Sequence, residues 1–237
     1  MPLSDYRYVF VVTYARSGST LLMSILNQGH DVCLRGENKA TLYHLYRAID
    51  AGIDTARRGK NGRQTQQDMP WFGAHEVKPV RFRNQLLNAF VSTVLTPPEG
   101  TRVTGFKEIR HESAFMNDED FAGYVSFLLT SFPDARIVFN SRDAAAVGKS
   151  AWLKDRPTTA VEKMVSTCDR RFATALQAHP DRCFLVKYED FTADPSRYEA
   201  LFAFLNLPYT PEVITRVLEK PLRHALRSKK PYGDASD

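Results

Sequence analysis

Five short runs of apolar residues, mostly β-branched or aromatic, are separated along the chain by longer segments of mixed polarity. Runs that are apolar at nearly every position are typical of strands buried on both faces of a parallel sheet. The pattern predicts strands at 8–12, 32–34, 102–109, 136–140 and 184–188.

Between these runs, apolar residues recur every three or four positions, which predicts helices. The helix over 21–26 is expected to end at Gly29, and acidic residues open the helix at 118–132, as the helix dipole favours. Other helices are predicted at 39–51, 81–95, 143–153, 158–178, 195–205 and 211–219. Strands that alternate with helices predict an α/β fold with three layers, in which helices flank a central parallel sheet.

The segment 56–72 is polar, basic and interrupted by glycines, so it is the best candidate for a loop in the chain. A loop of that length is either functional or mobile, and together with the following helix it is expected to shape a binding site. Because no repeat, low-complexity block or linker divides the sequence, we expect one domain over residues 1–237 with a basic tail at 221–237.

Composition narrows the classes of function. Hydrophobic residues make up 43% and charged residues 25%, which is ordinary for a globular protein. The net charge of +5 suits an anionic ligand but is too diffuse to predict nucleic-acid binding. Three widely spaced cysteines, Cys33, Cys168 and Cys183, are predicted to be reduced and buried. No apolar run reaches the ~20 residues of a membrane span, and no secretory signal is visible, so we expect a cytoplasmic protein.

The first strand leads into the segment 13–20, which reads TYARSGST, and then into a helix. Such a strand–loop–helix directs backbone N–H groups and a positive helix end at one point, which is a site for an anion. Gly18 permits close backbone approach, Arg16 supplies a forked cation, and the hydroxyls of Ser17, Ser19 and Thr20 add donors. The alternative interpretation is a serine-rich turn that only caps the helix.

The loop differs from the nucleoside-triphosphate P-loop, GxxxxGK[ST]. Ser19 stands where the lysine should be, Thr13 stands where the first glycine should be, and the cation precedes the glycine. The loop is therefore P-loop-like but poorly suited to ATP and magnesium.

A second candidate begins where the strand at 136–140 ends. Arg142 follows that strand, and Ser150 comes eight residues later. In a regular helix this is about two turns, so both side chains can face one ligand. An arginine with a hydroxyl suits an isolated phosphate, although an ordinary helix start explains the segment equally well.

Together, these segments resemble the sulfotransferase superfamily from residue 8 to about 205. That family has an Arg/Lys-Ser-Gly-Ser/Thr-Thr loop for the 5′-phosphosulfate, which matches 16–20, and an Arg and a Ser eight residues apart for the 3′-phosphate. A third segment, Tyr188-Glu-Asp after a strand, has its tyrosine near adenine in the family.

The resemblance implies a donor and a product. The donor is 3′-phosphoadenosine 5′-phosphosulfate (PAPS), the product is adenosine 3′,5′-bisphosphate (3′,5′-ADP, or PAP), and no metal is required. Arg16 would neutralise charge on the bridging oxygen, residues 17–20 would hold the 5′-phosphate and sulfonate, and Arg142 with Ser150 would hold the 3′-phosphate. An arginine in the first loop is similar to carbohydrate, tyrosyl-protein and bacterial members, so a carbohydrate, glycolipid, peptide or small-molecule acceptor is expected.

A hydroxyl acceptor needs a base, and two carboxylates are candidates. Glu37 follows the second predicted strand, at the position of the base in related tyrosyl-protein and bacterial glycolipid enzymes. Glu108 is the second choice, because Lys107-Glu108-Ile stands where cytosolic members have Lys-Thr-His; Lys107 would touch the sulfonate. His111 is expected on the surface.

Several features carry weaker expectations. Trp71 and Trp152 are assigned to the core in preference to an acceptor cleft, and the basic tail either closes the 3′-phosphate site or is disordered. Two other functions stay open: a P-loop kinase of a small metabolite, and a non-catalytic nucleotide-binding relative.

Overall fold

The computed structural model describes residues 3–59 and 66–220, apart from the side chains at 151 and 152. It contains a parallel five-stranded sheet in the order β2-β3-β1-β4-β5. Each strand lies within one residue of its predicted bounds: β1 (Arg7–Thr13), β2 (Val32–Arg35), β3 (Val103–Glu108), β4 (Arg136–Ser141) and β5 (Cys183–Lys187). The predicted α/β fold with a central parallel sheet is confirmed.

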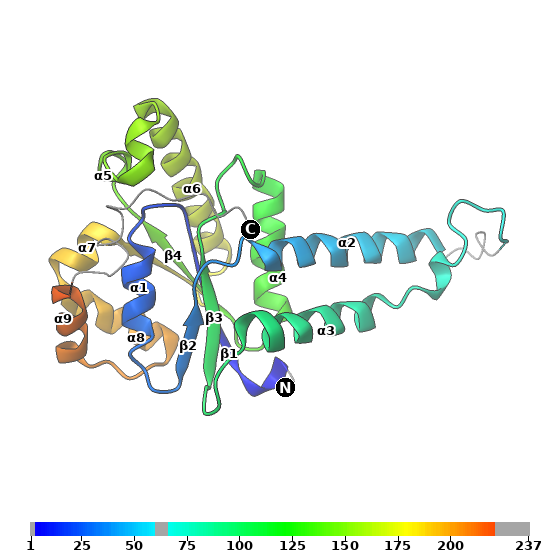
Figure 1. The fold of residues 1–237 in the computed structure, drawn as a ribbon, viewed down its shortest axis with the longest axis horizontal. Coiled ribbons are helices and arrows are strands. Elements are labelled where there is room, and N and C mark those ends of the chain that lie inside the picture. The colour runs from blue at the N-terminus through cyan, green and yellow to red at the C-terminus, as the bar shows by residue number, and fades with distance from the viewer. Residues whose placement is uncertain (1–2, 60–65, 221–237) are drawn as a thin grey trace, which may run out of the picture.

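Helices cover both faces of this sheet (Figure 1). One face carries α1 (Ser19–Leu26), α8 (Tyr198–Leu205) and α9 (Pro211–Glu219), and α7 (Tyr188–Ala193) lies on the same side. The other face carries α2 (Thr41–Gly59), α3 (Pro79–Ala89), α4 (Asp118–Ser131), α5 (Ala144–Gly148) and α6 (Thr158–Ala178). Short 3-10 helices lie at Leu3–Asp5, Ala74–Glu76, Ala151–Asp155 and Pro195–Arg197, and a π-helical segment lies at Phe90–Leu95.

The central strand β1 explains the two cores. Its side chains alternate, so Tyr8 and Phe10 enter the core under α4 and α6, whereas Val9 and Val11 enter the core under α1 and α8. Every residue from Tyr8 to Thr13 is buried. A strand buried on both faces must be apolar at consecutive positions, which is why the first predicted strand has no polar alternation.

Several helix predictions need correction. The helix predicted at 39–51 runs from Thr41 to Gly59, so the first residues of the predicted loop at 56–72 are helical. The first helix ends at Leu26 with Asn27 as its C-cap, not at Gly29. Asn27 ends the helix because its side chain exchanges two hydrogen bonds with the backbone of Leu34 on β2, at 2.9 and 2.7 Å.

Two more predicted helices are each divided into two elements in the structure. The helix predicted at 143–153 divides into α5, which ends at Gly148, and the 3-10 helix Ala151–Asp155. The helix predicted at 81–95 becomes α3 and the π-helical segment Phe90–Leu95. Helix α7 directly after β5 was not predicted, because its six residues are too few to show a helical period.

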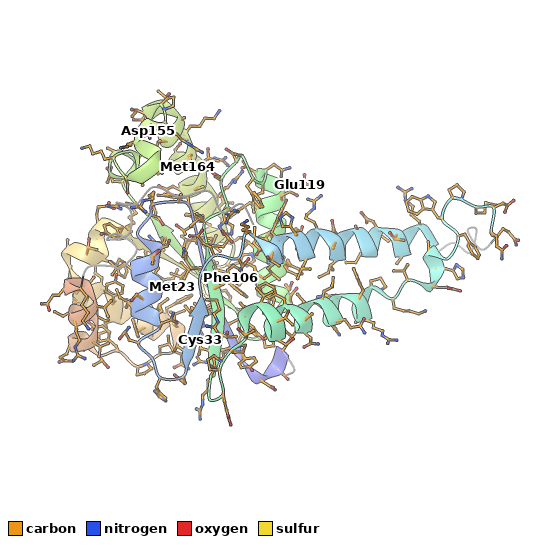
Figure 2. The ribbon with its side chains drawn as sticks, in the orientation of Figure 1. Met23, Cys33, Phe106, Glu119, Asp155 and Met164 are labelled. Carbon is orange, nitrogen blue, oxygen red and sulfur yellow. The ribbon has the colours of Figure 1, made fainter. Side chains whose placement is uncertain are left out.

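The helices α2 and α3 form an arm that projects from the body of the protein, as Figure 1 shows in light blue and blue-green. Figure 2 shows Phe106 inside the body, away from the arm. Helix α2 begins next to the carboxyl end of β2 and therefore joins the edge of the sheet to the arm.

Candidate functional site

The carboxyl ends of all five strands lie at one edge of the sheet, because the strands are parallel. Ligands of open α/β sheets bind at this edge, where neighbouring strands connect in opposite directions. Here β1 lies between β3 and β4, so the segments after these strands meet around the end of β1. Every predicted site residue except Ser150 lies on a carboxyl end or within seven residues after one.

The loop after β1 is held in a fixed shape by β4. Thr13 Oγ1 donates to the carbonyl of Asn140 at 2.6 Å and lies 2.7 Å from Ser17 Oγ. The Asn140 side-chain amide in turn donates to the carbonyl of Ser17 at 3.1 Å. Ser17 is fully buried, so its hydroxyl fixes the loop and does not face outward.

Two residues of this loop have positive φ angles, Arg16 at 66° and Gly18 at 84°. These conformations turn the chain so that α1 begins at Ser19 with Gly18 as its N-cap. The first N–H groups of a helix have no carbonyl partner within it, so the amides at the start of α1 are available to an anion. The predicted anion loop therefore has the geometry that such a site needs.

Gly18 is also required by a neighbour. A Cβ atom at this position would lie 2.1 Å from Cδ2 of Tyr188, so the tyrosine ring packs against the glycine itself. Tyr188 is the first residue of α7, directly after β5. The third predicted segment is thereby brought against the first.

The cations of the first two segments meet beside this contact. Arg16 Nε donates to Ser150 Oγ at 2.7 Å, and an Arg142 Nη donates to the Arg16 carbonyl at 3.1 Å. The Arg142 guanidinium lies 4.2 Å from the centre of the Tyr188 ring. Although α5 ends before Ser150, the backbone still brings Ser150 to Arg16, so the pairing does not depend on a regular helix.

Arg142 has spare capacity for an anion. Its Nε is buried and makes no hydrogen bond, and its nearest carboxylate, that of Glu189, lies 3.7 Å away. Its own backbone N–H donates to the Tyr14 hydroxyl at 2.7 Å, which fixes the main chain. A hollow of about 460 Å³ adjoins it, between the ends of β4 and β5 and helix α6.

A different cluster lies at the ends of β2 and β3. The Lys107 ammonium is buried and lies 2.5 Å from a carboxylate oxygen of Glu37. The other Glu37 oxygen lies 3.9 Å from the guanidinium of Arg110. Glu37 is partly exposed, with 38% of its side chain accessible, so a substrate hydroxyl can reach it.

Glu108 lies beside this pair but points into the protein. One of its oxygens accepts from the amides of Asn38 and Ala40, at 3.1 and 2.8 Å. The other accepts from the amide of Ile109 at 2.8 Å and from the Arg110 guanidinium at 3.0 Å.

The electrostatics of Glu108 follow from these contacts. Burial by itself raises the pKa of Glu108, but the hydrogen bonds from the amides of Ala40, Ile109 and Asn38 outweigh burial and lower this pKa below its ordinary value. Lys39 and Ala40 have positive φ angles of 54° and 57°, so the turn after Glu37 is strained and Glu108 stabilises it.

His111 was predicted on the surface, and this prediction is wrong. The ring is buried, with Nδ1 3.0 Å from the carbonyl of Thr13, and it stacks on Tyr124. Burial lowers its pKa below the ordinary value. The chain after β3 turns inward instead of outward, because Arg171 donates to the His111 carbonyl at 2.8 Å and anchors it.

Other predicted positions fall in different places. Trp71 was assigned to the core but is exposed on the arm, where the Arg58 guanidinium lies 5.4 Å from its ring centre. The side chain of Trp152 and the tail at 221–237 lie outside the described residues.

The three cysteines are free, and Cys168 and Cys183 are buried as predicted, whereas Cys33 is only partly buried. Burial raises the pKa of each buried thiol to about 12.

Arg110 and Asn38 belong to the site but were not predicted. Arg110 bridges Glu108 and Glu37, and the Asn38 side-chain nitrogen is buried next to Glu37 without a hydrogen-bond partner. The signal in the sequence that could have identified them is their position within two residues of the predicted carboxylates. The contacts themselves join residues about 70 positions apart, which no local pattern reveals.

Neither metal ligands nor membrane spans are seen in the described residues. Within 3–59 and 66–220, no three His, Cys, Asp or Glu side chains gather as a metal site would require. The helices in the same ranges are too short or too polar to cross a bilayer.

Comparisons with known proteins agree with this geometry. The sequence matches the model of the sulfotransferase family over residues 8–211. The fold is similar to the sulfotransferase domain of the Synechococcus PCC 7002 olefin synthase, with a TM-score of 0.54, 18% identity, and coverage of 98% of this chain and 82% of that one. It is also similar to the sulfotransferase domain of the curacin biosynthetic pathway, with a TM-score of 0.50, 14% identity, and coverage of 92% and 79%. No curated protein matches the sequence at a significant level.

Proposed function

Because this chain belongs to the sulfotransferase family, we propose that it transfers a sulfuryl group from PAPS to an acceptor hydroxyl and releases 3′,5′-ADP. The observation that carries the proposal is the convergence of Arg16, Arg142 and Ser150, from two loops more than 120 residues apart, at the carboxyl edge of the sheet. Two cations and a hydroxyl in one place suit a donor with phosphates at two positions.

The residues fit this donor. The N-terminus of α1 and the Gly18 turn would hold the 5′-phosphate and sulfonate, because unpaired amides and a positive helix end favour anions. Arg142 would hold the 3′-phosphate with its Nε, which makes no hydrogen bond, and Ser150 would assist it. Tyr188 would contact the adenine, and the hollow of about 460 Å³ that Arg142 lines would offer space for the donor.

Arg16 would act where charge develops. The bound donor supplies an activated sulfur whose bond to the bridging oxygen breaks as the acceptor oxygen bonds to sulfur. Arg16 lies at the start of the loop that would surround this bridging oxygen, and its guanidinium can neutralise the charge that forms on that oxygen.

Glu37 would serve as the base, and Lys107 would stabilise the negative charge of the sulfonate. The acceptor proton passes to the Glu37 carboxylate, which is partly exposed and is oriented by Lys107 at 2.5 Å. As the proton reaches Glu37, the ammonium of Lys107 is freed from its partner and can stabilise the negative oxygens of the transferring group.

Glu108 is less suited to be the base. Both of its oxygens accept hydrogen bonds from backbone amides, and its pKa lies below the ordinary value, so it is a poor proton acceptor. We assign it the role of a positioning residue that holds the turn at 38–40, and with it Glu37.

Two features of the site support a proposed class of acceptor. Glu37 is accessible at the surface, and Arg16 occupies the cationic position that carbohydrate and tyrosyl-protein members share. We therefore propose a hydroxyl on a carbohydrate, glycolipid, peptide or small molecule as the acceptor.

Donor-dependent turnover tests this function. The full chain would be incubated with PAPS and a panel of sugar, glycolipid, peptide and phenol acceptors, and release of 3′,5′-ADP would be measured. Acceptor-dependent release without added metal supports the proposal. ATP-dependent and magnesium-dependent phosphorylation of the same panel would replace it with a small-molecule kinase, and binding of 3′,5′-ADP without any turnover would indicate a non-catalytic relative.

A further inference from the structure

The large apolar side chains that are exposed in the described part of the chain lie on or at the root of the arm. They are Met69, Trp71, Phe72, Val80, Phe82 and Val94. Five of the six fall within residues 69–82, and Phe72 and Trp71 are 53% and 42% accessible. Single exposed apolar residues are normal on a protein surface, but a concentration in one short segment indicates an interaction site.

The longer segment 56–83, which contains this stretch, is strongly basic. Residues 56–83 contain seven Lys and Arg against two Asp and Glu, and this excess of five equals the net charge of the whole chain. Its described cations are exposed or half-exposed: Arg57, Arg58, Lys78, Arg81 and Arg83. We name the described residues 57–59 and 66–82 the arm tip.

The arm holds this tip away from the body (Figure 1). Helix α2 has 19 residues, which corresponds to a length of about 28 Å, and its other end adjoins the Glu37 turn. At the tip, a Cβ atom on Gly59 would lie 2.2 Å from the backbone nitrogen of His75, so the end of α2 packs directly on the 3-10 helix Ala74–Glu76. The tip is thus a packed structure, separate from the candidate active site.

The chemistry of the tip suits one class of partner. Tryptophan and phenylalanine insert into the interface between lipid head groups and acyl chains, and nearby arginines and lysines are attracted to anionic head groups. The Arg58 guanidinium over the Trp71 ring places a cation next to the aromatic group, an arrangement that serves both contacts at once. A projecting tip can insert to a shallow depth, whereas a protein partner of ordinary size needs a broader complementary face.

We propose that the arm tip docks the protein on the surface of an anionic lipid bilayer, with Trp71 and Phe72 inserted at the interface and the neighbouring cations on the head groups. This docking requires neither a donor nor turnover, so vesicle binding can be tested independently of the proposed sulfotransferase activity.

Vesicle co-sedimentation of the full chain tests the proposal. We expect binding to vesicles that contain phosphatidylglycerol, much weaker binding to pure phosphatidylcholine vesicles, and loss of binding when salt rises from ~0.1 M to ~1 M, because the Debye length falls from about 10 Å to about 3 Å. Replacing Trp71 and Phe72 together with alanine should weaken binding at least about ten-fold. Lys78→Glu should weaken it about five-fold or more, since one cation near an anionic surface contributes about a factor of five.

Matched variants separate docking from general effects. Lys220→Glu makes the same charge change at the end of α9, and Val94→Ala removes an exposed apolar side chain at the root of the arm. Both should leave vesicle binding within about two-fold of the original protein, because neither variant changes a residue of the arm tip. Circular dichroism melting would confirm that each variant is folded.

Three results would overturn the proposal. The first is absence of binding to phosphatidylglycerol vesicles at low salt. The second is equal weakening by the tip variants and the control variants. The third is a change of oligomeric state in the tip variants, seen by light scattering without any vesicle binding, which would show that a second copy of the chain covers the tip.

Discussion

At the carboxyl edge of the sheet, the β1–β4–β5 side and the β2–β3 side hold their cations differently. On the first side, Arg16 bonds to the Ser150 hydroxyl and Arg142 bonds to the Arg16 carbonyl, whereas the carboxylate of Glu189 lies 3.7 Å from Arg142 Nε, beyond hydrogen-bond distance. On the second side, Lys107 is paired with Glu37 and Arg110 with Glu108, so each cation has a carboxylate partner.

This difference indicates two separate tasks. Cations whose hydrogen bonds go to neutral groups keep most of their attraction for an incoming anion, which suits the phosphates of a donor. A lysine and carboxylate in contact form a nearly neutral pair, and a proton that arrives on the carboxylate leaves the positive charge of the lysine without a partner beside the reacting group, which suits activation of an acceptor. The predictions that follow test this division of the edge into a donor side and an acceptor side.

The largest effect is expected for Glu37→Gln on the acceptor side. Removing a general base lowers turnover by roughly 10²–10⁴-fold, while affinity for 3′,5′-ADP should stay unchanged because the donor side is intact. Steady-state release of 3′,5′-ADP from PAPS and calorimetric binding would be measured on the same preparation. The control is Glu99→Gln, an exposed carboxylate in the turn before β3. Full turnover in Glu37→Gln would remove Glu37 from the role of base.

The next effect is expected for Arg142→Ala on the donor side. Loss of a charge-assisted contact should weaken 3′,5′-ADP binding by ~2–3 kcal/mol. The matched control is Arg136→Ala, which removes an arginine from the opposite end of the same strand, where it packs on Phe204. Equal affinity in the two variants would contradict the assignment of the 3′-phosphate site to Arg142.

A smaller effect is expected for Gly18→Ala, which tests how the donor side is built. The positive φ alone costs ~1–2 kcal/mol for alanine, and the new methyl group also displaces the Tyr188 ring. Gly100→Ala is the matched control, because Gly100 has nearly the same φ of 82° but open space around it. Thermal unfolding and 3′,5′-ADP affinity should both suffer more in Gly18→Ala. If the two variants behave alike, packing of Tyr188 on the loop contributes little.

The smallest effect concerns the dependence of stability on pH. The pKa of Glu108 is lower in the folded protein than in the unfolded chain, so the unfolded chain binds more protons as the pH falls. Its stabilising contribution is therefore complete above the ordinary pKa of glutamate and is lost as the pH falls through the lower folded-state value. Urea unfolding at a series of acidic pH values should show a shallower fall in stability for Glu108→Gln than for the original protein. Identical slopes would mean that Glu108 does not stabilise the turn at 38–40 through its charge.

The geometry of the β1–β4–β5 side was largely predictable from the sequence, and the geometry of the β2–β3 side was not. Gly18, Arg16 and the strand before them are neighbours in sequence, so local chemistry is enough to predict an anion loop there. Arg142 and Ser150 were predicted to face one ligand on the basis of a regular helix between them, but that helix ends at Gly148. The strands were predicted closely because a sheet buried on both faces requires unbroken apolar runs.

The choice between Glu37 and Glu108 depends on contacts across about 70 residues, which have no local signature. The burial of His111 likewise depends on Arg171, far along the chain on α6. The length of α2 was underestimated because its outer turns contain two glycines and end in Arg57 and Arg58, so they look like a polar loop. Trp71 was assigned to the core by residue type alone, although its neighbours in the sequence are polar and basic.

The most direct test of the central claim is calorimetric titration of the metal-free protein with 3′,5′-ADP, with 5′-ADP and ATP as comparison ligands. The convergence of Arg16, Arg142 and Ser150 predicts clear preference for 3′,5′-ADP without magnesium. Preference for ATP with magnesium, or equal affinity for 3′,5′-ADP and 5′-ADP, would contradict a donor site that recognises phosphates at both positions.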